Sequence, residues 1–123
     1  MITRRVSLQI LGAGAAASAL GAGPALAAAE KTLTIGISLP LTGADAESAK
    51  RIEDGALLAI DDANAKGGVA GYKLRAMISD NGTATAGQYD PAQAATNARK
   101  MVSNRNVVAA VGPQMSGSGK AMG

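Results

Sequence analysis

The sequence predicts an α/β fold built on a parallel sheet. Short apolar segments alternate with longer segments whose apolar residues recur at helical spacing, in the order β-α-β-α-β, and a further helix begins after the last strand. Helices of this length between strands favour right-handed crossovers, which make successive strands parallel. The chain has 16 glycines, which indicate tight turns or close backbone approaches.

The first strand and the first helix are predicted from two different periodicities. Residues 33–39 alternate Leu and Ile with small or polar side chains and end at Pro40, as expected for a buried strand. The helix covers about residues 47–65 and ends at Gly67-Gly68. Its buried stripe is expected to consist of Ile52, Ala56, Ala59, Ile60 and Ala63. Its solvent side is expected to carry Glu53, Asp54, Asp61 and Asp62.

The second half of the chain repeats this alternation. Residues 73–79 read as a strand, and Asp80-Asn81-Gly82 reads as a turn. Asp80 is expected to stabilise this turn; alternatively, it serves a site at the ligand edge of the sheet. Asp90-Pro91-Ala92-Gln93 predicts a helix start with Asp as N-cap, Pro at the first position and Gln at the third, and the helix ends near residues 103–104. Residues 107–111 form a wholly apolar strand, which we expect to be buried on both faces.

The composition excludes several classes of function. A length of 123 residues allows at most one domain. The chain has no Cys, and therefore no disulfide framework and no thiolate nucleophile, and it has no His, the commonest general base and metal ligand. We therefore expect no catalytic residues, no metal site and no cofactor, so that the chain is not an enzyme.

Residues 1–29 have the parts of an export signal peptide. Arg4 and Arg5 precede a long uncharged stretch rich in Ala, Gly and Leu, and small residues place the cleavage site near residues 27–29. The twin arginine favours Tat over Sec export, and the weak hydrophobicity argues against a membrane-spanning helix.

Without these two arginines the remainder of the chain has 10 basic and 9 acidic residues. The net charge of +3 therefore does not indicate a nucleic-acid partner.

The candidate site lies in the loops that follow the first and third strands, residues 40–47 and 113–119, because ligands of parallel sheets bind at the carboxyl ends of the strands. The second loop is rich in Gly and Ser and leads into a helix, which suits an anion, and Ser116 and Ser118 add hydroxyl donors. A phosphate loop would need a Gly where Gln114 stands and a terminal hydroxyl that is missing, so a carboxylate is favoured. Alternatively, either serine simply caps the helix.

Two segments carry a resemblance to a known family. Residues 35–43 (IGISLPLTG) and residues 55–71 (GALLAIDDANAKGGVAG) resemble periplasmic type 1 solute-binding proteins of the branched-chain amino acid (Leu/Ile/Val) ABC transporter class. Asp80, Asp90-Pro91 and residues 107–112 continue the pattern in register. The similarity extends over residues 33–119.

This resemblance implies a two-lobed clamshell that closes on a small ligand and delivers it to an ABC permease in the inner membrane. Residues 30–123 would form the first half of the N-terminal ligand-binding lobe. Ser116 would hold the ligand carboxylate, with Met115 and Gln114 lining the pocket and Ser118 nearby. Many relatives carry an aromatic residue in the loop after the first strand, whereas residues 44–48 of this chain contain none.

The implied function is that of a periplasmic substrate-binding subunit for a branched-chain amino acid or a similar small carboxylate or amide. One alternative is an extracytoplasmic ligand-sensing domain of the same fold. Another is a truncated, non-functional fragment.

Overall fold

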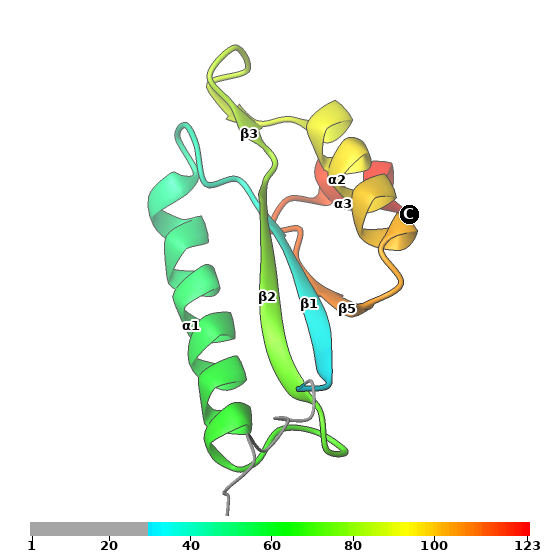
Figure 1. The fold of residues 1–123 in the computed structure, drawn as a ribbon. Helices are drawn as coiled ribbons and strands as arrows, with labels where there is room; N and C mark the ends of the chain where they lie inside the picture. Colours follow the sequence, from blue (N-terminus) through cyan, green and yellow to red (C-terminus); the bar gives the residue numbers. More distant parts are fainter. Residues whose placement is uncertain (1–29) are drawn as a thin grey trace, which may run out of the picture.

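The computed structural model describes residues 30–123, and the signal peptide predicted for residues 1–29 lies outside this range (Figure 1). The elements, in chain order, are β1 (Thr32–Leu39), α1 (Ala46–Ala65), β2 (Lys73–Asp80), β3 (Gly82–Thr83), β4 (Gln88–Tyr89), α2 (Pro91–Ser103), β5 (Val107–Val111) and α3 (Ser116–Met122). Each strand and helix predicted from the sequence is present. The short hairpin β3–β4 is additional, since the sequence predicts only a turn at its start.

Three parallel strands form the sheet, in the order β2-β1-β5. Ile37 of the central strand β1 pairs with Ile78 of β2 and with Val111 of β5. Figure 1 shows α1 on one face of the sheet and α2 with α3 on the other. The chain is therefore an α/β protein with a parallel sheet, as predicted.

The core on the α1 face is built around Ile37 and Leu39 of β1 and Ala49 of α1, all fully buried. The predicted stripe on α1 is partly wrong. Ile52 is 39% exposed, while Leu57 packs against the core and Glu53 is buried at 8% exposure. Because most of the candidate positions are Ala, the apolar pattern does not define sharply which side of the helix faces the core.

The buried carboxylate of Glu53 lies on the core-facing side of α1, contrary to the expected solvent-facing position. Its Oε2 is 3.4 Å from the Lys50 ammonium, which also binds Asp54. The Asp54 hydrogen bond, opposed by desolvation, raises the pKa of Lys50 above its usual range. Lys50 therefore provides the compensating charge that a buried carboxylate needs.

On the opposite face, α2 packs closely against β1. Gly36 makes this possible, because a Cβ at this position would lie 2.6 Å from the Met101 sulfur. Asp90 caps α2 as predicted, and its carboxylate accepts from the N–H groups of Ala92 at 2.8 Å and Gln93 at 3.3 Å. The Gln93 side chain does not complete a capping box; it donates to Asn97 Oδ1 at 3.0 Å.

Strand β5 is largely exposed, so the prediction that it is buried on both faces is wrong. Val108 is 56% exposed, and the two alanines that follow it are exposed as well. The physical reason is that β5 lies at an edge of the sheet. Strand β5 pairs with β1 along one edge only, and the helices of residues 30–123 pack mainly over β1 and β2.

Among the helices of residues 30–123, none combines the length and the apolar character that crossing a membrane requires.

Candidate functional site

The carboxyl ends of the three parallel strands bring three connecting segments together at one edge of the sheet. These are the loop between β1 and α1, the hairpin β3–β4 after β2, and the loop between β5 and α3, found at the upper part of Figure 1. Residues distant in the sequence meet here, as the parallel topology requires. The two loops chosen from the sequence are therefore neighbours, and the hairpin is a third component.

Asp80, the last residue of β2, joins the first two segments. Its Oδ1 accepts from the N–H of Leu41 at 2.8 Å and the N–H of Gly82 at 2.7 Å, and its Oδ2 accepts from the Thr42 hydroxyl. Both carboxylate oxygens are thus occupied by the protein. Asp80 stabilises the turn after β2, as expected, and also holds the loop after β1 in place.

Close backbone contacts fix the hairpin against the loop after β1. The N–H of Ala44 donates to the Gly87 carbonyl at 3.0 Å. Gly43 has a φ of +91°, and a Cβ there would lie 2.5 Å from the same carbonyl oxygen, so this position requires glycine. The sequence signal for the hairpin is weak because each of its strands has only two residues.

Gln114 connects the loop after β5 to the start of α1. Its Nε2 donates to Ser48 Oγ at 2.8 Å, and the Ser48 hydroxyl in turn donates to the Asp45 carbonyl at 2.9 Å. Since the single hydroxyl proton of Ser48 is used, its oxygen must accept, and this fixes the orientation of the Gln114 amide. Within the described part of the chain, the buried Gln114 Oε1 has no hydrogen-bond partner.

The two candidate serines occupy different environments. Ser116, the first residue of α3, is exposed, whereas Ser118 is fully buried and its hydroxyl has no partner among residues 30–123. Met115 is the half-buried N-cap, and no side chain caps the helix. The alternative that Ser116 or Ser118 serves as a helix cap is therefore wrong. Ser116 directly follows the loop after β5 and is exposed to solvent.

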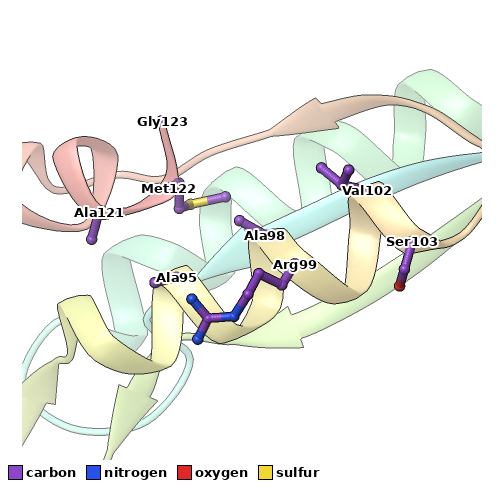
Figure 2. Close-up of a pocket in the computed structure, with 8 residues that line it drawn as sticks. All are labelled: Ala95, Ala98, Arg99, Val102, Ser103, Ala121, Met122 and Gly123. Atoms are coloured by element: carbon purple, nitrogen blue, oxygen red, sulfur yellow. The ribbon is translucent and has the colours of Figure 1, made fainter.

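A separate cavity of about 360 Å³ lies between α2 and the end of α3 (Figure 2). It is lined by Ala95, Ala98, Arg99, Val102, Ser103, Ala121, Met122 and Gly123. It contains none of the residues predicted to bind a ligand. Its lining is largely apolar, with one guanidinium from Arg99, so it does not share the chemistry of the edge formed by the loops.

Comparison with known proteins places the fold in a family. Residues 32–123 match the periplasmic binding protein family. The Leu/Ile/Val-binding protein BraC3 of Rhizobium johnstonii is 36% identical over 89 residues, which are 72% of this chain and 22% of that protein.

Two solved structures illustrate the range of relatives. One is the branched-chain amino acid transporter substrate-binding protein LivJ from Streptococcus pneumoniae in complex with isoleucine, with 33% identity, a TM-score of 0.66, and coverage of 75% of this chain and 25% of that one. The other is a fatty acid ABC transporter substrate-binding protein from Thermomonospora curvata, with 31% identity, a TM-score of 0.58, and coverage of 73% and 22%.

These relatives are described as binding proteins, the two solved structures as binding proteins of transporters, and not as enzymes. The chain spans about a quarter of their length. The family match, however, extends from the start of β1 to the last residue and includes all three segments at the carboxyl edge of the sheet. The chain therefore belongs to the periplasmic binding protein family.

Proposed function

We propose that the protein containing this chain is the substrate-binding subunit of an ABC importer and that it captures a branched-chain amino acid or a similar small carboxylate or amide by clamshell closure. The observation that carries this proposal is the position of Ser116 at the edge where the loop after β5 meets the start of α1 through the Gln114–Ser48 hydrogen bond. Membership of the periplasmic binding protein family supports a ligand at this edge.

Within this site, we assign the ligand carboxylate to the hydroxyl of Ser116 and to backbone N–H groups of the same loop. Met115 and Gln114 line the pocket beside it. The side chain of Gln114 also serves as a link between the two loops, because its amide N–H is committed to Ser48. Ser118 lies nearby on α3, where it is fully buried and its hydroxyl has no partner among residues 30–123.

Export and delivery complete the proposal. Residues 1–29 direct the protein to the periplasm as a cleaved signal peptide of the Tat type. There it delivers its ligand to an ABC permease in the inner membrane. The naming of relatives as transporter binding proteins supports this partner.

A carboxylate common to the ligands of two relatives supports the proposed ligand class. Isoleucine, bound by the Streptococcus pneumoniae protein, and fatty acids, named for the Thermomonospora curvata protein, both carry a carboxylate. A hydroxyl at Ser116 serves either ligand. The higher identity and TM-score of the isoleucine-bound relative favour an amino acid.

Calorimetric titration of the protein containing this chain tests the ligand class. The ligands are L-isoleucine, L-isoleucinol, which lacks the carboxylate, and octanoate, which lacks the ammonium. We expect binding of isoleucine and a loss of about 100-fold with isoleucinol, because the charge-assisted hydrogen bonds to the carboxylate disappear. A preference for octanoate would identify a fatty acid, and not an amino acid, as the ligand class. Equal affinity for isoleucine and isoleucinol would contradict the assignment of the ligand carboxylate to Ser116.

A further inference from the structure

Tyr89, at the end of the β3–β4 hairpin, reaches the first turn of α3. A Cβ placed on Gly117 would lie 3.1 Å from Tyr89 Cε2 and 3.5 Å from its hydroxyl oxygen. The ring therefore covers the space where a side chain at residue 117 would begin. Tyr89 itself is held by antiparallel pairing with Gly82, whose N–H donates to Asp80.

Gly117 differs from the next glycine of the helix in what surrounds it. Neither Gly117 nor Gly119 has a positive φ, so neither backbone conformation requires glycine. A Cβ on Gly119 would meet only Pro113 Cγ, at an ordinary contact distance of 3.7 Å. A Cβ on Gly117 would instead meet the Tyr89 ring at a distance tighter than most real Cβ contacts. The absence of a side chain at residue 117 thus allows the ring to approach the helix.

Helix α3 depends on such support from another element. It has seven residues, two of which are glycines, and it has no side-chain cap at its N-terminus. Short helices without caps and with glycines are unstable on their own, and tertiary packing must hold them. The Tyr89 ring provides packing at the turn that carries Ser116.

We propose that Tyr89 is a positioning residue for the ligand-binding loop, in which its ring packs on Gly117 and holds the first turn of α3 so that Ser116 faces the ligand. The effect on ligand affinity rests on the proposed function. The effect on α3 concerns the protein without ligand, and it does not rest on the proposed function. The hairpin therefore acts as a support between the loop after β1 and the loop after β5.

The test uses the protein containing this chain, with Tyr89→Ala, Tyr89→Phe, Gly117→Ala and the control Gly119→Ala. The first measurement is hydrogen exchange of the Gly119 amide without ligand, because this N–H donates to the Met115 carbonyl at 3.0 Å and reports closure of the first turn. We expect Tyr89→Ala to speed this exchange about tenfold, with Tyr89→Phe close to the unsubstituted protein.

The second measurement is the dissociation constant for L-isoleucine. Tyr89→Ala and Gly117→Ala should each weaken binding about tenfold, their double variant should be far from additive, and Gly119→Ala should bind normally. Unchanged Gly119 exchange in Tyr89→Ala, or equal losses in Tyr89→Phe and Tyr89→Ala, would overturn the packing role. If Tyr89→Ala does not fold, Tyr89→Leu takes its place.

The two proposals fail in different ways. If the unsubstituted protein binds no ligand, the proposed function is wrong, and Gly119 exchange alone decides whether Tyr89 holds the helix. If ligand binds but Tyr89→Ala leaves both exchange and affinity unchanged, the positioning role is wrong and the proposed function stands.

Discussion

Ser116 is the residue on which the proposed ligand site depends most directly. The residue is exposed at the start of α3, where Met115 is the N-cap and no side chain caps the helix. Ser116→Ala should weaken isoleucine binding by about 1–3 kcal/mol, the contribution of a hydrogen bond to a charged group. The matched control is Ser103→Ala, which removes an exposed hydroxyl at the end of α2 that bonds only the Lys100 carbonyl. Calorimetry showing equal affinities for both variants would remove Ser116 from the site.

Asp80 offers a second residue-level test, one of stability. Three donors converge on its carboxylate, from Leu41, Thr42 and Gly82. Asp80→Asn replaces one acceptor oxygen by an NH₂ group that faces a donor, so unfolding should become easier by about 1–3 kcal/mol in a urea titration.

Asp61→Asn, on the exposed face of α1, is the matched control for Asp80→Asn. It should change the free energy of unfolding by less than about 0.5 kcal/mol. An Asp80 variant as stable as this control would mean that its hydrogen bonds contribute no net stability.

The candidate site could be predicted in part from single residues. Ser116 and Gln114 stand in a Gly- and Ser-rich loop whose position after an apolar strand is visible in the sequence. Tyr89 could not be identified in this way. It is an isolated aromatic residue, and its contact with Gly117 depends on a hairpin too short to leave a periodic pattern.

At the scale of elements, the packing of α2 on β1 depends on the absence of a side chain at Gly36. A methyl group there would lie 2.6 Å from the Met101 sulfur, which is 4% exposed and has little room to move. Gly36→Ala should therefore destabilise the fold by about 1–3 kcal/mol, the usual result of overpacking a core.

Gly55→Ala is the control for Gly36→Ala, because no atom lies within 4 Å of its added Cβ in the middle of α1. It should stabilise the fold by about 1 kcal/mol through helix propensity alone. Thermal unfolding of both variants measures the difference. Destabilisation by both would show that neither open space nor helix propensity governs the result.

The elements themselves were predictable because their periodicities and boundary residues are strong. Asp90 and Pro91 mark the start of α2, and the hydrogen bonds to the Asp90 carboxylate confirm that Asp90 caps this helix. The sequence did not predict accurately which residues of α1 face the core. Alanine contributes little burial wherever it faces, so the positions of Ile52 and Leu57 depended on contacts with β1.

At the scale of the whole molecule, the exposed strand β5 is the feature that the sequence predicts least well. Its composition is that of a strand covered on both faces, yet burial depends on what packs against it. Within residues 30–123 its outer edge has no strand partner, and it carries no charged side chain. The other edge strand, β2, carries Lys73, Arg75 and Asp80, which discourage pairing with another chain.

This difference predicts how a polypeptide of residues 30–123 behaves by itself. We expect low stability and self-association through β5, because an uncharged apolar edge is a template for further pairing. Val108→Lys places a charge on this strand, where the residue is already 56% exposed. Sedimentation velocity should then show about a tenfold smaller fraction of oligomers, since charged residues block edge-to-edge pairing.

Val102→Lys is the matched control, since Val102 is 86% exposed and belongs to α2 and not to the sheet. It removes an equally apolar side chain and adds the same charge, so a general effect of net charge would appear in both variants. A decrease in oligomers for Val108→Lys alone assigns self-association to β5. An equal decrease in both would contradict that assignment and indicate a general effect of net charge.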